Sequence, residues 1–145
     1  MTHTPTEQAN IDLIRRLFEA EGRSDWDAYF ALWAEGCVVH VAGQSVIQGK
    51  AAFRAFFSAA MATFAAFSHF SHTILDLKAE GEDVVFRWRF HPTVRATGKQ
   101  VSWEGIHWMK VRDGLIYEDW NYADPAEVQR VLAGAMEAGA MEAGE

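Results

Sequence analysis

The amino-acid sequence predicts an α+β domain in which three N-terminal helices pack on one face of a curved antiparallel sheet. Apolar residues recur at helical spacing in the first half of the chain and with a period of two in the second half. Two short turn signals, Glu80-Gly81 and Asp113-Gly114, divide the second half into hairpins. The length of 145 residues is that of one domain.

The N-terminal helices are predicted from capping residues and from apolar spacing. Residues 4–7 form a capping box with Pro5 at the first helical position, and the helix that follows ends at Gly22. The segments 24–36 and 50–64 predict a short and a longer helix, both rich in aromatic residues.

A terminal helix begins at Pro125, after the last predicted strand. Residues 135–145 repeat the unit A-G-A-M-E and offer no apolar face, so we expect this tail to fray. The predicted domain therefore spans residues 1–134.

Alternating apolar residues predict a small first hairpin and then a meander of four strands. The predicted strands are 37–42, 45–47, 68–78, 83–91, 100–111 and 115–123. A sheet that curls around helices leaves one open end, which is a natural place for a small-molecule site.

Charge and composition exclude several classes of function. The net charge is −7 and the isoelectric point is near 5.3, which argues against nucleic acid or an anionic membrane as a partner. The single cysteine excludes an internal disulfide, and the first residues lack a signal-peptide pattern, so we expect a cytoplasmic protein.

Assigning the two sheet faces from the turns brings polar residues into an aromatic interior. A two-residue turn at Asp113-Gly114 pairs His107 with Trp120, and it pairs Trp103 with Asp124. The same alternation places an apolar set on the outer face, and we expect a homodimer through this convex face. That set is Phe70, Ile106, Trp108 and Tyr117.

The segment 97–124 carries a pattern that resembles a known family. It reads T-G-K, an alternating strand, D-G-L-I-Y-E-D-W, and then Asp124 four residues after Trp120. Together with the G-K-A-A-F-R-A-F-F segment at 49–57, it resembles the SnoaL-like branch of the nuclear-transport-factor-2-like superfamily. The resemblance implies a cone-shaped α+β barrel, usually dimeric, with a pocket between helices and sheet.

Asp124 and His107 are the candidate catalytic residues. The resemblance to the polyketide cyclases implies that Asp124 is the acid/base, and the assigned faces place His107 beside it. Asp124 equally suits the N-cap of a helix that begins at Pro125, and the two roles are compatible.

The predicted substrate-binding residues are the aromatic and histidine side chains expected in the pocket. They are Tyr29, Trp33, His40, His69, Trp88, Trp103, Trp120 and Tyr122. The histidines match no metal-ligand spacing, so we predict neither a metal site nor a cofactor.

These residues predict a cofactor-independent acid/base enzyme of the cyclase or isomerase type, acting on a hydrophobic, oxygenated small molecule. An alternative is a dehydratase-like lyase that uses two pocket histidines, His69 and His107, with Tyr29. A further alternative is a non-catalytic, ligand-binding dimeric domain of the same fold.

Overall fold

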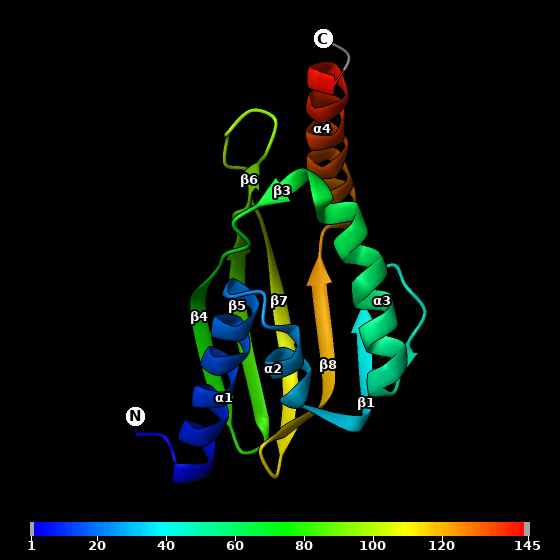
Figure 1. Ribbon diagram of the computed structural model, residues 1–145. Helices are drawn as coiled ribbons and strands as arrows, with labels where there is room; N and C mark the ends of the chain where they lie inside the picture. The colour runs from blue at the N-terminus through cyan, green and yellow to red at the C-terminus, as the bar shows by residue number, and fades with distance from the viewer. Residues whose placement is uncertain (1, 144–145) are drawn as a thin grey trace.

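The computed structural model describes residues 2–143, which form one six-stranded sheet with helices on one of its faces (Figure 1). The sheet order is β2-β1-β8-β7-β5-β4, and β3 and β6 form a separate small pair. The helices are α1 (Pro5–Gly22), α2 (Trp26–Ala31), α3 (Lys50–Thr63), the 3-10 turn η1 (Phe64–Ala66) and α4 (Pro125–Ala143). The strands are β1 (Trp33–Val41), β2 (Ile47–Gln48), β3 (Phe67–Ser68), β4 (His72–Glu80), β5 (Asp83–Phe90), β6 (Thr93–Val94), β7 (Trp103–Arg112) and β8 (Leu115–Ala123).

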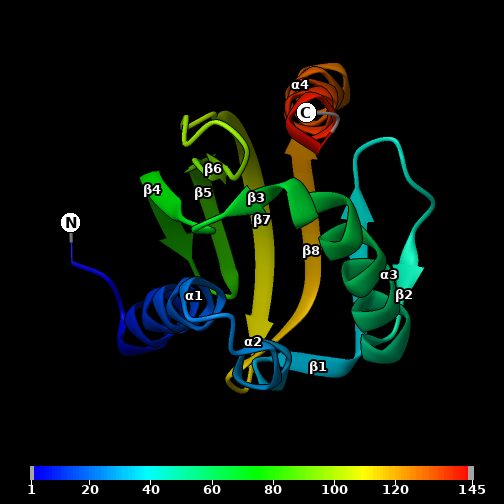
Figure 2. The same ribbon diagram turned by 45° about the horizontal axis from the view of Figure 1, so that its top comes forward.

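The α+β architecture predicted from the sequence is confirmed, with one difference in the sheet. β1 runs parallel to β8, whereas the other neighbouring strands are antiparallel. Figure 2 shows α1 and α3 toward opposite edges of the sheet, with α2 between them near one end of β7 and β8. The space between these helices and the sheet is the molecular interior in which the candidate site lies.

Helix α1 forms as its sequence predicts. The Thr4 side chain accepts a hydrogen bond from the Glu7 amide, and the Glu7 side chain accepts one from the Thr4 amide, which completes the capping box. The apolar residues Ile11, Ile14 and Leu17 are buried against the sheet. This face holds α1 next to β4 and β5.

The β7–β8 hairpin contains a bulge that the sequence argument did not include. Val111 pairs with Ile116 as predicted, but Tyr117 is then an extra residue in β8. The remainder of β8 is therefore inverted, so that Asp119 faces the interior and Trp120 does not. The prediction of an inward Trp120 is therefore wrong. Ile116 is buried as expected, but the extra residue after it shifts the pairing of β8 by one, which turns Trp120 to the outer face.

A second bulge inverts the first residues of β4. Leu77 pairs with Phe86, and the register shifts between Ile74 and Asp76. His72 therefore lies opposite Phe90 on the buried face. Without the bulge, alternation would place the residues on either side of His72 on that face instead.

The C-terminal segment is helical farther than expected. Helix α4 continues to Ala143, in place of a frayed tail from residue 135, and residues 144–145 lie outside the described part of the chain. Alanine, methionine and glutamate are strong helix formers, and Leu132 and Ala135 are buried at its base. Among the described residues, no helix is long and apolar enough to cross a membrane.

Candidate functional site

The centre of the site is a histidine–carboxylate pair on neighbouring strands. His107 Nδ1 lies 2.8 Å from Asp119 Oδ1 in hydrogen-bond geometry. The Asp119 side chain is 2% exposed and that of His107 is 13% exposed. The carboxylate is therefore sealed behind the imidazole, while the imidazole itself remains accessible.

The bulge in β8 is what creates this pair. It turns Asp119 inward beside His107, so the buried carboxylate has a hydrogen-bond partner. A buried polar group costs little when it is paired and a few kcal/mol when it is not. The hydrogen bond to His107 therefore removes the free-energy penalty that burial of Asp119 would otherwise carry.

A second histidine–carboxylate pair lies between β4 and α1. His72 Nδ1 is 2.8 Å from Glu21 Oε2, and both side chains are 13% exposed. The contact has the distance of an ion pair, but its angle is not that of a hydrogen bond. His72 Nδ1 therefore has no hydrogen-bond partner. Glu21 therefore holds its imidazole less firmly than Asp119 holds His107.

Aromatic rings join the two pairs. The Trp88 ring centroid lies 5.3 Å from that of His72 and 5.9 Å from that of His107. Phe86 stacks on His107 at 5.2 Å, and Phe90 stacks on His72 at 4.6 Å. The two imidazoles thus flank one indole on the inner face of the sheet.

Tyr29 of α2 lies within electrostatic reach of the carboxylates of both pairs. It is buried in α2, and burial raises the pKa of its hydroxyl well above the ordinary value for tyrosine. The negative charges of Glu21 and Asp119 raise this pKa further. The Tyr29 hydroxyl is therefore protonated at neutral pH and available as a hydrogen-bond donor.

Several buried polar atoms near this site have no partner among the described residues. They are Nε1 of Trp33, Nε1 of Trp88 and Oδ1 of Asn121. Asn121 lies directly opposite His107 in the register of β7 and β8. Unpaired buried groups of this kind call for an explanation, and a bound ligand is one.

Asp124 is not part of this interior cluster. It is exposed at the end of β8, and its Oδ1 accepts a hydrogen bond of 3.0 Å from the Ala126 amide. Of the two roles open to Asp124 from the sequence, the structure contains the helix cap. The predicted approach of Asp124 to His107 is wrong, because the bulge shifts the end of β8 by one residue.

Three other predicted pocket residues lie on the outer face of the sheet. His40 stacks on Trp120 with ring centroids 4.7 Å apart and planes 2° apart, and its Nε2 lies 2.9 Å from Glu118. Tyr122 is 53% exposed. All three follow the inverted register of β8, and β1 pairs with that strand.

His69 also lies outside the interior. It is exposed, with a φ of 55°, and its nearest side-chain partner is the adjacent Ser68. The predicted inward residues Trp33, Trp88 and Trp103 are all buried in the core.

Sequence reasoning missed Glu21, His72, Asp119 and Asn121 as interior polar residues. Simple alternation from the turns places His72, Asp119 and Asn121 on the outer face, and it fails because each lies beyond a bulge. Glu21 carried a usable signal, since it lies one turn after Leu17 and Phe18 on the buried side of α1.

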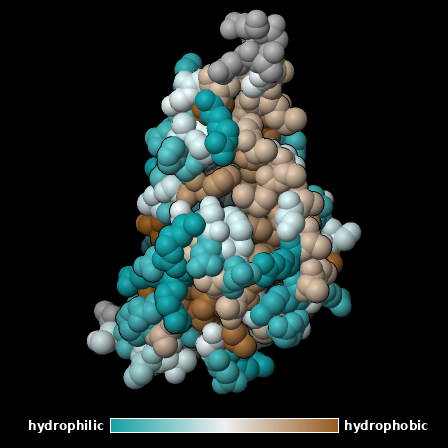
Figure 3. All heavy atoms as spheres, in the orientation of Figure 1, coloured by the Kyte–Doolittle hydropathy of each residue, from teal (hydrophilic) through white to brown (hydrophobic). Residues whose placement is uncertain are grey.

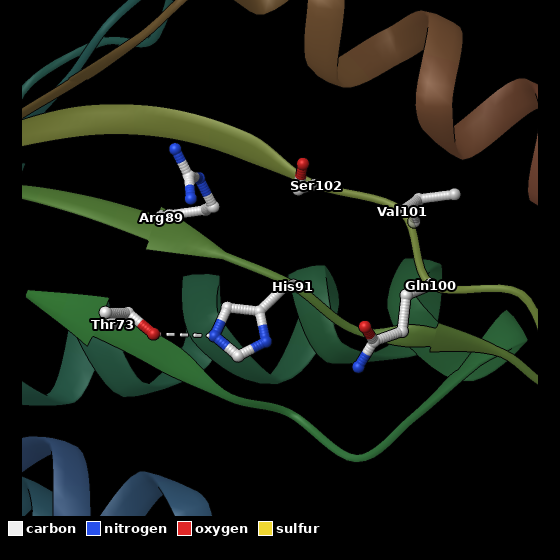
Figure 4. A pocket seen from close by; sticks show the side chains of 6 residues that line it. All are labelled: Thr73, Arg89, His91, Gln100, Val101 and Ser102. Carbon is white, nitrogen blue, oxygen red and sulfur yellow. Dashed lines mark hydrogen bonds between the residues drawn. The ribbon is translucent and has the colours of Figure 1, made fainter. Parts of the chain in front are cut away.

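A recess of about 300 Å³ lies on the outer face, apart from the interior cluster (Figure 4). Its lining residues are Thr73, Arg89, His91, Gln100, Val101 and Ser102. Thr73 Oγ1 and His91 Nε2 are 2.8 Å apart, and Arg89 is paired with Glu104. Three of its polar side chains, Thr73, His91 and Arg89, thus already have partners.

The helix side of the molecule carries an apolar band (Figure 3). Tan and brown residues run down α4 and α3, beside the hydrophilic residues on the rest of this face. Apolar side chains therefore reach the surface along these two helices. Within residues 2–143, no three His, Cys, Asp or Glu side chains are placed to hold a metal ion.

Comparison with solved structures shows the same fold in proteins of several described activities. A protein described as a SnoaL-like polyketide cyclase from Jannaschia sp. CCS1 matches with a TM-score of 0.76 and 19% identity, over 89% of this chain and 94% of that one. AclR, described as a hydroxylase from Streptomyces galilaeus, matches with a TM-score of 0.72 and 18% identity, over 88% and 98%. An epoxide hydrolase of the LEH-like type from M. tuberculosis matches with a TM-score of 0.71 and 19% identity, over 94% and 98%.

Sequence comparison gives the family. A search of curated proteins finds no significant match. The model of the SnoaL-like domain matches residues 14–119, which include the interior pairs and most of the sheet. The chain therefore belongs to the SnoaL-like domain family, within the nuclear-transport-factor-2-like fold.

Proposed function

We propose that this protein is a cofactor-independent acid/base enzyme that transfers a proton on a hydrophobic, oxygenated small molecule bound between helices and sheet. The observation that carries the proposal is the His107–Asp119 pair, whose carboxylate is buried and whose imidazole is accessible. Histidine is suited to proton transfer near neutral pH, and a carboxylate behind it sets its tautomer.

The proposed mechanism uses the two ring nitrogens differently. Nδ1–H of His107 donates a hydrogen bond to Asp119, so Nε2 keeps its lone pair and acts as the base. Nε2 removes a proton from the carbon next to a substrate carbonyl, and the carbonyl oxygen takes the negative charge. Tyr29, which stays protonated, donates a hydrogen bond to that oxygen. Return of the proton from His107 to another carbon completes an isomerisation.

In this proposal the acid/base role that the family resemblance implies for Asp124 passes to His107, which Asp119 orients. Asp124 caps α4, whereas Asp119 contacts the accessible imidazole. The aromatic walls proposed for the site are Trp33, Trp88 and Trp103, all three of which are buried, and Trp88 contacts both site histidines.

Deuterium exchange into 2-tetralone, a bicyclic ketone with acidic C–H groups, tests the proposal. We expect the wild type to accelerate exchange in D2O near pH 7. His107→Gln should reduce this acceleration by about 10²-fold or more, because a general base contributes that much. His69→Gln and Asp124→Asn are matched controls on exposed residues, and both should keep the wild-type rate. Equal rates in wild type and His107→Gln would refute the mechanism, and no exchange by the wild type would favour a non-catalytic binding domain.

A dehydratase-like lyase is the second candidate, and the His72–Glu21 pair favours it. His107 would take the proton next to a carbonyl while His72, when protonated, gives a proton to the leaving hydroxyl, so that water departs and a double bond forms. The sequence-based version of this hypothesis named His69, which is exposed, and His72 takes its place. The probe is 3-hydroxy-1-tetralone, whose dehydration gives fluorescent 1-naphthol. Loss of naphthol formation in His72→Gln with normal exchange into 2-tetralone would support the lyase.

We also propose that the protein is a homodimer through the outer sheet face. Ile106, Trp108 and Tyr122 form an apolar band there, with exposed fractions of 43%, 47% and 53%. Trp120 lies opposite Trp108 and extends this band. Exposed apolar side chains that adjoin in this way are typical of protein interfaces.

Two residues that the sequence assigned to this interface lie elsewhere. Phe70 stacks on Phe90 at 6.0 Å and packs against the core. Tyr117 donates a hydrogen bond to Glu82, and its ring lies under the Arg112 guanidinium. The bulge within β4 accounts for the position of Phe70, and the bulge within β8 accounts for that of Tyr117.

A further inference from the structure

The interior cluster contains two carboxylates, one beside each of the two histidines that flank Trp88. Glu21 reaches it from α1 and Asp119 from β8, and each lies 2.8 Å from an imidazole nitrogen. Both carboxylates act on the Tyr29 hydroxyl, whose pKa they raise in addition to the effect of burial. The two carboxylates thus lie among the same buried aromatic side chains, each behind a histidine that contacts Trp88.

No cationic side chain accompanies these carboxylates. The structure describes every lysine and arginine of the chain, and all but Lys50 and Lys110 are exposed. Lys50 pairs with Glu35 at 3.3 Å, and Lys110 pairs with Asp83 at 3.1 Å. Among the described residues, the ion-pair partners of the two carboxylates are the imidazoles of His72 and His107.

The two charges are not offset equally. Asp119 accepts a hydrogen bond from His107, whereas the Glu21–His72 contact lacks hydrogen-bond geometry. Glu21 is also the more accessible carboxylate, with a side chain that is 13% exposed against 2% for Asp119. A bound ligand would therefore experience the charge of Glu21 more directly than that of Asp119.

From this arrangement we infer that the interior site selects uncharged ligands and excludes anionic ones, with Glu21 as the specificity-determining residue. The inference rests on the proposed function, because it concerns the ligand of the same site. Repulsion between like charges is strong among aromatic rings, where little water screens it, and a carboxylate ligand would also lose its hydration there. The substrate class is thus an uncharged ketone or alcohol on an apolar frame, rather than a free acid.

A matched pair of probes tests the inference. 2-Acetylnaphthalene and 2-naphthoate share one ring system and differ in carrying a ketone or a carboxylate. We would measure both dissociation constants by calorimetry at pH 8, where histidines in ordinary surroundings are uncharged. We expect the wild type to bind the ketone at least about 10-fold more tightly than the carboxylate, which corresponds to about 1.4 kcal/mol.

Neutralising Glu21 should relax this selection. We expect Glu21→Gln to reduce the preference for the ketone by about 5-fold or more, because the amide keeps the shape and removes the charge. Glu19→Gln is the matched control, since Glu19 is an exposed acid on the same helix, and it should leave the preference unchanged. If circular dichroism shows that Glu21→Gln is unfolded, Asp119→Asn replaces it, with a smaller relaxation expected.

The outcomes separate this inference from the proposed function. Equal binding of the two probes by the wild type, or an undiminished preference in the folded neutralised variant, would overturn the charge selection. Charge selection without deuterium exchange into 2-tetralone would refute only the catalytic proposal. Exchange without charge selection would refute only the present inference, and failure of the wild type to bind 2-acetylnaphthalene would overturn it as well.

Discussion

Gly105 is the position at which a single added methyl group should disturb the site most. A Cβ atom at Gly105 would lie 2.3 Å from Cζ2 of Trp88 and 2.7 Å from the carbonyl oxygen of Tyr122. Trp88 is buried, and its indole lies between the two site histidines. Glycine is required here because the indole packs directly on the β7 backbone.

We expect Gly105→Ala to lower the free energy of unfolding by about 2–4 kcal/mol. Overpacking a core costs about 1–3 kcal/mol, and the Tyr122 oxygen belongs to a paired strand that cannot move easily. For a domain of this size, the loss corresponds to a decrease in melting temperature of roughly 5–15 °C. The assay is urea unfolding followed by circular dichroism, with calorimetry for the melting temperature.

A double-mutant cycle shows whether Trp88 is the cause. In a Trp88→Leu background the indole is absent, so Gly105→Ala should cost only about 1 kcal/mol, which leaves a coupling energy of about 1–3 kcal/mol. Gly134→Ala is the control, because no atom lies within 4 Å of the added carbon and alanine is the better helix former. A cost of Gly105→Ala that is the same with and without Trp88 would refute the reasoning.

Two further predictions concern the sheet edge and the outer face. Hydrogen bonds from Arg112 and Tyr117 lower the pKa of Glu82. The Glu82 carboxylate therefore stabilises the fold above the ordinary pKa of glutamate, and this stabilisation is lost as the pH falls through the lowered pKa. Urea unfolding of Glu82→Gln from about pH 6 to about pH 3 should show a difference from wild type that shrinks with acid, and a constant difference would contradict this assignment. Trp108→Glu should convert the dimer to a monomer in light scattering at micromolar concentration, because a buried unpaired charge is costly at an interface. The comparison is Arg16→Glu at an exposed position of α1, outside this face, and a wild type that is already monomeric would contradict the dimer.

Much of the fold could be predicted because local signals and global packing agree. The capping box of α1, the aromatic spacing of α3 and the turn at Asp113-Gly114 each specify their element from a few neighbouring residues. The buried faces of β5 and the first half of β7 follow simple alternation. For these segments, the hydrophobic pattern was sufficient.

The site was harder to predict because it depends on two bulges. A bulge inverts every side chain beyond it, and nothing in the local sequence around Leu75 or Tyr117 marks an extra residue. His107 was placed correctly because it lies in β7, on the unbulged side of the hairpin. Asp119 was placed wrongly because its burial is favourable only together with His107, a contact across two strands that alternation does not reveal.

The parallel pairing of β1 with β8 places the first strand of the chain beside the last long one. Val38 pairs with Glu118 and Val39 with Asp119, so this part of the sheet joins residues that are far apart in sequence. Closing so long a loop costs entropy before the pairing returns any stability, and we expect this step to be late and slow in folding. During synthesis, the first hairpin and the helices would therefore wait without their sheet neighbour until β8 has emerged. Until then His107 would lack its partner, and the acid/base pair would form only with the final closure of the sheet.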